Sequence, residues 1–181
     1  LEPGEKIYIE IKGLHAMELG KALVKAATEA GGVPFWYYND EELSRGFVKN
    51  AGREQFQAWG QFHRPIMEAV DAYIGVRGAP NVSELSDVPQ SQQKMYERYI
   101  WKRVHMDIRV SDTRWVVLRW PSASMAQLAE RSTEDFEDFY FRVCTMDYER
   151  MSEALQPLRE LMEARLSRRV SRSLVAGSSL R

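Results

Sequence analysis

The chain has 181 residues, of which 44% are hydrophobic and 28% are charged, and its formal net charge is -1 at pH 7. These proportions are ordinary for a globular protein with a core of its own. So small a charge gives no basic surface for nucleic acid or a membrane, and no apolar run approaches the roughly 18 residues of a bilayer span. The single cysteine, Cys144, excludes an internal disulfide and favours a reducing, cytoplasmic location.

Four short runs rich in β-branched and aromatic residues predict strands, at 7–11, 33–38, 72–76 and 115–119. The first follows a Pro-Gly turn. In the second, Pro34 lies near the start, where a missing hydrogen-bond donor matters least.

Apolar residues at helical spacing predict the segments between these strands. The expected helices are 16–30, 41–70 with breaks at Gly52 and near Pro65, 91–104 capped by Ser91, a short helix around Met125, one capped by Ser132, and a last one that Pro157 should kink. Phe56, Trp59, Phe62 and Ile66 form one predicted apolar stripe, and the span 105–112 stays ambiguous.

Strands alternate with helices, and no two strands are joined by a two-residue hairpin turn. This order predicts a three-layer α/β fold, with a mostly parallel sheet of about four strands and helices on both faces. In such a sheet, ligands bind beyond the carboxyl ends of the strands. That rim would hold 12–15, Asn39 with Asp40, 77–81, and 120–122.

The sequence contains none of the motifs typical of a nucleotide site, a zinc protease or a serine hydrolase. His15 with Glu18, or His105 with Asp107 on a strand, could each supply two metal ligands, but surface histidines beside acids are common and neither pair is specific. Arg77 and Arg119 could bind a carboxylate, although we favour structural pairing with an acid. Cys144 is expected to be buried and inert.

Several stretches resemble the amino-terminal domain of the thermophilic metallo-aminopeptidases, the M29 family that includes aminopeptidases T and S. They are YIGVRGAPN (73–81), DVP (87–89), TRWVVLRWP (113–121), SMAQLA (124–129), STEDFEDFYF (132–141) and VCTMDY (143–148). The likeness covers about residues 1–163.

This resemblance implies a peptide hydrolase that removes amino-terminal residues, uses two divalent ions (zinc, cobalt or magnesium) and forms a cytoplasmic homodimer. The family's metal ligands lie in a carboxyl-terminal domain, and no position here matches them. We therefore expect residues 1–163 to be scaffold, with no catalytic, cofactor-binding or metal-binding residue, and the fragment to be inactive by itself.

Two departures from the family pattern stand out. Arg131 lies where an apolar residue is expected, and 164–181 forms a tail with five Arg and no acid. The tail predicts disorder or a shifted reading frame. Two alternative functions remain open: a free-standing dimerisation or interaction module, and a small-ligand-binding α/β domain without catalysis.

Overall fold

The structure is a computed structural model that describes residues 1–177, with the backbone alone for 166–177. Residues Leu1–Glu137 form one compact unit, and the residues from Asp138 onward form a second. None of the described helices combines the length and apolar character that crossing a membrane requires.

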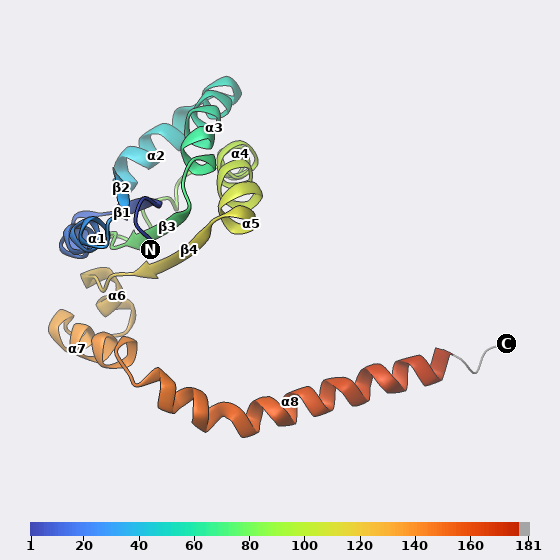
Figure 1. The fold of residues 1–181 in the computed structure, drawn as a ribbon. Coiled ribbons are helices and arrows are strands. Elements are labelled where there is room, and N and C mark those ends of the chain that lie inside the picture. The colour runs from blue at the N-terminus through green and yellow to red at the C-terminus, as the bar shows by residue number, and fades with distance from the viewer. Residues whose placement is uncertain (178–181) are drawn as a thin grey trace. The chain divides into compact units, whose positions relative to one another are not determined.

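The first unit is built on one four-stranded sheet in which every neighbouring pair is parallel (Figure 1). Its strands are β1 Lys6–Lys12, β2 Val33–Asn39, β3 Ala72–Arg77 and β4 Arg114–Arg119, in the spatial order β2-β1-β3-β4. All four predicted strands are therefore confirmed, each within two residues of its expected ends.

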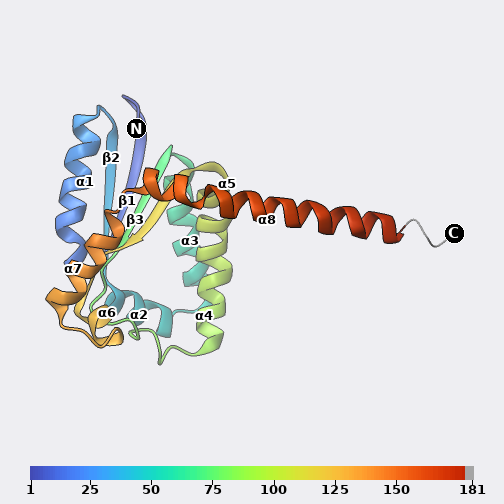
Figure 2. The same cartoon turned by 90° about the horizontal axis from the view of Figure 1, so that it is seen from below.

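The helices that connect these strands cover both faces of the sheet, as predicted, with α1 on one side and α3 and α4 on the other (Figure 2). They are η1 Leu14–Ala16, α1 Met17–Glu29, α2 Glu41–Asn50, α3 Arg53–Glu68, α4 Gln90–Tyr96, the π-helix η2 Glu97–Arg109, α5 Val110–Asp112, α6 Ala123–Leu128, α7 Thr133–Cys144 and α8 Tyr148–Gly177.

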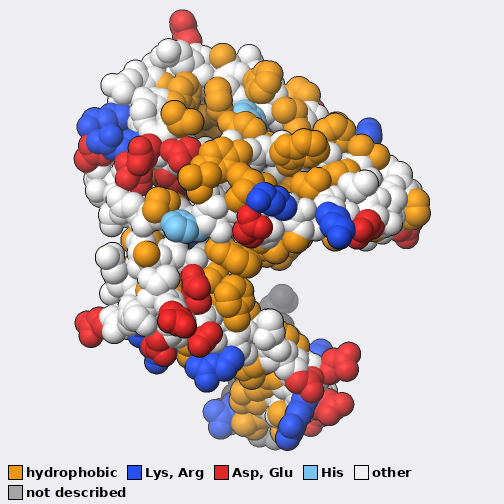
Figure 3. Space-filling view, turned by 90° about the vertical axis from the view of Figure 1, so that its left-hand side faces the viewer, with side chains coloured by type: hydrophobic (Ala, Val, Ile, Leu, Met, Phe, Trp, Pro, Cys, Tyr) orange, Lys and Arg blue, Asp and Glu red, His pale blue; other side chains and the backbone are white. Residues whose placement is uncertain are grey.

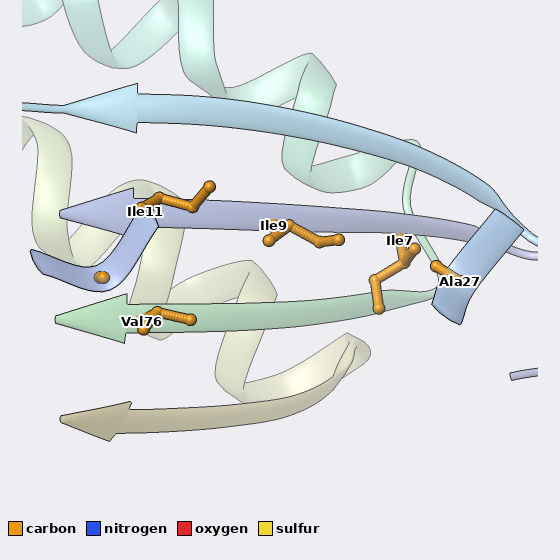
Figure 4. Packing of buried hydrophobic residues seen from close by; sticks show 6 residues of the cluster. Ile7, Ile9, Ile11, Ala27 and Val76 are labelled. Carbon is orange, nitrogen blue, oxygen red and sulfur yellow. The ribbon is translucent and has the colours of Figure 1, made fainter. Parts of the chain in front are cut away.

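Alternate residues of β1 point to opposite faces of the sheet and enter two different cores. Ile7, Ile9 and Ile11 face α1 and pack with Ala27 and Val76 (Figure 4). Leu19 and Leu23, predicted on the inner side of α1, pack against this cluster. Residues on both sides of this central strand are mostly apolar because helices cover both faces of the sheet.

On the opposite face, Tyr8 and Tyr73 pack with Met67 of α3 and with Val104 and Ile108 of η2. A third cluster joins α2, α3, α4 and η2 through Val48, Ala51, Phe56, Val88, Tyr99 and Ile100. Helices α3 and η2 approach closely at Gly60, where a β-carbon would collide with the carbonyl oxygen of Tyr99. Glycine is required there because backbone atoms, unlike a flexible side chain, cannot move aside.

Three helix boundaries differ from the prediction. Helix α3 continues through Pro65 to Glu68, so the break expected near the proline is not seen, although Pro65 cannot donate a backbone hydrogen bond to the preceding turn. Helix α4 begins at Gln90 after Pro89, and no side chain caps it, so the Ser91 cap is wrong. The ambiguous span 105–112 is helical, as the end of η2 followed by α5.

The predicted apolar stripe of α3 is buried only in part. Phe56 is fully buried, but Trp59 is 40% and Phe62 is 68% exposed. The side chains of Phe139, Val143 and Met146, expected on one inner face, are each more than 40% exposed. Periodicity identified these helices correctly, but it does not show whether a second layer covers their apolar side.

The Ser132 cap is confirmed. The amide of Asp135 donates to the Ser132 hydroxyl at 3.3 Å, which caps α7. Helix α8 contains Pro157 in its interior, and the kink expected there stays a prediction. Arg131, which replaces an expected apolar residue, forms a surface ion pair with Asp135 at 3.2 Å. Of the predicted tail, 178–181 lies outside the described residues.

Candidate functional site

The most distinctive polar site in the first unit is centred on Glu10, a carboxylate in the middle of the central strand β1. Only 12% of its side chain is exposed. The Tyr73 hydroxyl donates to one carboxylate oxygen, and the Asn39 amide donates to the other at 3.4 Å. The Lys12 ammonium lies 3.8 Å from the same oxygen as Asn39. Each of these partners comes from a strand of the same sheet.

Asn39 extends this network to a helix. Its side-chain oxygen Oδ1 accepts a hydrogen bond of 2.8 Å from the Ser44 hydroxyl on α2. Because Asp40 caps the same helix by accepting from the amides of Glu42 and Leu43, the start of α2 is fixed by two adjacent residues at the end of β2. The cluster therefore links β1, β2, β3 and α2 (hereafter the Glu10 cluster).

Glu10 stays ionised in this setting. Burial alone would raise the pKa of its carboxyl group, but the charge of Lys12 and the hydrogen bond from Tyr73 outweigh burial, so the pKa is lowered. The pKa of Tyr73 is raised, first by burial and then by the negative charge of Glu10. Near neutral pH the phenol is thus a donor to an ionised carboxylate.

Two histidines from different helices lie around this carboxylate. His105 of η2 meets the Tyr73 ring edge-on at 6.2 Å, and His63 of α3 meets the Tyr37 ring edge-on at 5.7 Å. Burial lowers the pKa of both imidazoles, that of His105 to about 4, although the charge of Glu10 opposes the shift in each case. Both rings are therefore neutral near pH 7.

Some polar atoms around this cluster have no partner among the described residues: His63 Nε2, His105 Nδ1, and Nε and Nη1 of Arg109. Arg109 is only 6% exposed, and its guanidinium lies over the rings of Tyr73 (4.9 Å) and Trp115 (4.6 Å). Burial lowers the pKa of Arg109, but a guanidinium keeps its charge. Two aromatic faces offset part of the cost of burying that charge.

The loops at the carboxyl ends of β1 and β3 come together, as the sequence predicted, but they leave no crevice between them. The Gly78 amide donates to the Lys12 carbonyl at 2.7 Å. Gly13 has a positive φ of 79°, and a β-carbon there would collide with the Gly78 carbonyl. Backbone atoms thus fill the position where many folds of this kind bind a ligand.

The rest of the predicted rim has structural roles. Asn81 bonds to Glu84 at 2.9 Å, and Ser122 caps α6 through the Met125 amide. Arg77 is exposed and makes no side-chain hydrogen bond or ion pair with a described residue, so the expected structural pairing is not seen for it.

Neither histidine pair forms a metal site. His15 is exposed, and Glu18 pairs with Lys21 at 2.6 Å. His105 and Asp107 lie on a π-helix, not a strand, so the first is partly buried against the Tyr73 ring while the second is exposed. Among the residues described, no three His, Cys, Asp or Glu side chains are grouped to hold a metal ion.

Cys144 is an unpaired, exposed cysteine, so the expectation of a buried one is wrong. It lies in the second unit, on the part of α7 whose apolar side chains are themselves exposed.

A separate, apolar groove of about 360 Å³ lies between α1 and β2. Its lining residues are Ile11, Met17, Gly20, Lys21, Val24, Lys25 and Trp36. The two lysines pair with Glu18 and Glu29, so their charges are offset at the surface.

Sequence reasoning did not single out Glu10, Tyr73 or Arg109 as site residues. For Glu10 the sequence does contain a signal, because it is the one acidic residue within the apolar runs of the predicted strands. Helices predicted on both faces of the sheet should cover its strand. A buried carboxylate needs several donors, so its position alone pointed to a polar cluster. The partners could not be found without the sheet register and the course of η2.

Comparisons with known proteins complete the description. The family described as thermophilic metalloprotease (M29) matches residues 1–168. Among solved structures, wild-type AmpT from Thermus thermophilus is similar with a TM-score of 0.49 at 20% identity, over 66% of this chain and 32% of that chain. A likeness of that size carries no argument by itself. No curated protein matches the chain.

Proposed function

The chain belongs to the thermophilic metalloprotease (M29) family, and we propose that it is the amino-terminal scaffold of a metal-dependent aminopeptidase, which removes amino-terminal residues from peptides. The family match carries this proposal, because residues 1–168 include the whole sheet and the helices that cover it. The aligned part spans about a third of the AmpT chain, so the activity of a complete enzyme belongs to the proposal.

The described residues do not fit the metal centre of such an enzyme. A hydrolytic metal site needs three or more converging ligands, and no such group occurs among the described side chains. We therefore assign the ligands of the two divalent ions (zinc, cobalt or magnesium) to a carboxyl-terminal domain beyond residues 1–163. No residue described above is given a catalytic, cofactor-binding or metal-binding role.

The Glu10 cluster supports the role as scaffold. It ties three strands together through hydrogen bonds to the charged Glu10 carboxylate, and the Ser44–Asn39 bond extends it to α2. Such bonds are stronger than neutral ones and fix geometry. A rigid sheet is what a domain needs if it forms part of the wall of a substrate cavity.

We further propose that the chain forms a homodimer, that the complete enzyme acts on peptides, and that it is cytoplasmic. The surface of the first unit supports the homodimer. Large apolar side chains of β2, α2 and α3 lie exposed. They are Phe35, Trp36, Leu43, Trp59 and Phe62. Figure 3 shows hydrophobic side chains gathered on the face that it draws. Exposed apolar patches of this kind mark interaction surfaces, so they equally favour the second candidate, an interaction module without catalysis.

Metal retention tests the proposal directly. The purified chain is dialysed against Zn²⁺ or Co²⁺, then against metal-free buffer, and its metal content is measured by elemental analysis. We expect no stoichiometric metal to remain. Two tightly held ions per chain would place the catalytic ligands within this chain and contradict the scaffold assignment, and a His105→Asn variant would then show whether the Glu10 cluster holds them.

A further inference from the structure

The carboxyl ends of β1 and β3 carry two cationic side chains on one face of the sheet. The isoleucines of β1 face α1, so Lys12, which alternates with them, faces η2. On β3, Val76 faces α1 and Tyr73 faces η2, so Arg77 lies on the η2 face as well. Lys12 and Arg77 are partners in the parallel register, and neighbouring strands lie only about 4.8 Å apart.

Arg77 has no counter-charge among the described residues. Its side chain is exposed and forms no hydrogen bond or ion pair with them. Lys12 has an acidic neighbour in Glu10, at 3.8 Å, but that carboxylate also accepts from Tyr73 and Asn39. The positive charge of Lys12 and Arg77 together therefore exceeds the negative charge beside them.

The other ionisable groups on this face do not neutralise Arg77. Helix η2 contributes Arg109, which is buried and has two nitrogens without a partner in the part of the chain described. Burial first, and then the positive charge of Arg77, lower the pKa of Arg109. The histidines of α3 and η2 are neutral near pH 7 because burial lowers their pKa. Arg119 is the register partner of Arg77 on β4, and the balance is positive even when Arg119 is neutralised.

These two side chains lie where parallel sheets bind ligands. In the order β2-β1-β3-β4, the chain leaves β1 toward β2 but leaves β3 toward β4. Ligands of open α/β sheets bind at the carboxyl ends of the strands where the order reverses in this way. The backbones of Gly13 and Gly78 close the gap between the two loops. The exposed Arg77, beside the partly exposed Lys12, is therefore the part of this point that a ligand can reach.

We propose that Arg77 and Lys12 bind the oxyanion group of a small ligand, either a carboxylate or a phosphate. A guanidinium can donate two parallel hydrogen bonds to such a group, and the ammonium adds a further donor and a second charge. A bound anion also offsets the repulsion between the neighbouring cations. The site is independent of the aminopeptidase assignment, because it depends on the charges of this face alone.

Backbone amide chemical shifts of the full chain, followed by NMR, test this. Inorganic phosphate and acetate are titrated separately near pH 7, at an ionic strength held constant with sodium chloride. We expect saturable shifts at Lys12, Gly13, Arg77 and Gly78 with at least one of the two anions, and the anion that binds identifies the ligand group. If neither anion shifts these amides more than chloride does, the side chains attract adventitious counter-ions only, and the proposal is overturned.

Three arginine variants identify the residue that holds the anion. Arg77→Gln removes the cation that has no partner and should weaken binding at least about tenfold. Arg77→Lys keeps the charge without the planar fork and should bind with intermediate affinity. Arg103→Gln removes an exposed arginine of η2 and should leave the affinity within about twofold. Unchanged affinity in folded R77Q contradicts the assignment, and the titration of the unmodified chain requires no variant to fold.

Discussion

At the scale of single residues, the fold depends on a carboxylate that is buried in its ionised form. Glu10 accepts from Tyr73 and Asn39 and lies near Lys12, which together hold its pKa below the ordinary value despite burial. A buried charge remains tolerable only while its partners stay in place, because loss of one leaves the desolvation cost uncompensated.

Removal of the Tyr73 hydroxyl should therefore be costly. Tyr73→Phe keeps the ring and its packing but deletes the donor, so we expect the free energy of unfolding in urea to fall by about 1.5–3 kcal/mol. Tyr8→Phe is the control, since Tyr8 is equally buried but its hydroxyl makes no hydrogen bond to a described residue. Equal losses in the two variants would show that Tyr73 acts through packing and not through Glu10.

His105 should make the fold sensitive to mild acid. Burial lowers its pKa from 6.5 to about 4. Below pH 6.5 the imidazole therefore binds a proton in the unfolded chain but not in the folded chain. The free energy of unfolding should thus fall by about 1–2 kcal/mol between pH 6.5 and 5, with His63 acting in the same direction. The lowered pKa of Glu10 adds a further loss only below pH 4.5.

Denaturation curves of a His105→Gln variant across that range provide the check. The variant should lose less stability on acidification than the unmodified chain, while His15→Gln, at an exposed position, should follow the unmodified chain. Parallel curves for all three proteins would mean that His105 titrates normally in the folded state.

Gly60 allows α3 and η2 to touch. Gly60→Ala places a β-carbon against the Tyr99 carbonyl oxygen, and we expect a loss of about 1–3 kcal/mol from the strain of separating the helices. Gly46→Ala in α2 meets nothing within 4 Å and should instead be neutral or stabilising by up to about 1 kcal/mol. Thermal unfolding of both variants measures the contrast, and a harmless Gly60→Ala would refute the close contact.

At the scale of elements, the strands could be predicted because each is an apolar run with clear ends. Pro34 fits the same logic, since its missing amide hydrogen faces outward at the sheet edge. The π-helical course of η2 could not be predicted, because the spacing of its buried residues fits neither a clear α-helix nor a strand. The Glu10 cluster could not be predicted either, because it unites β1, β2, β3 and α2, and the sheet register that brings their side chains together cannot be read from the sequence.

The apolar stripe of α3 shows that helical periodicity predicts which residues share a face of the helix but not which of them are buried. Phe56 and Phe62 share the predicted face, but the first is buried and the second is 68% exposed. Phe56→Ala should cost about 3–5 kcal/mol, whereas Phe62→Ser should change stability by less than about 0.5 kcal/mol. Chemical denaturation compares them, and a large loss from Phe62→Ser would mean that this side chain is covered in solution.

At the scale of the whole molecule, two observations frame the account. The family match covers residues 1–168, and the described side chains bring no set of metal ligands together. The first assigns the chain to a family of metalloproteases, and the role of this domain as scaffold stays a proposal. Sheet, helices and family could be anticipated from sequence patterns. Which apolar surfaces remain uncovered could not, because burial depends on what packs against each helix.

The most direct measurement is the release of leucine from leucine amide by the purified 181-residue chain, with added Zn²⁺, Co²⁺ or Mg²⁺ and with EDTA as control. The account predicts no turnover above the metal-only background, because the proposal assigns the metal ligands to a carboxyl-terminal domain beyond residues 1–163. Robust turnover that EDTA abolishes would contradict it and would place a complete catalytic site within this chain.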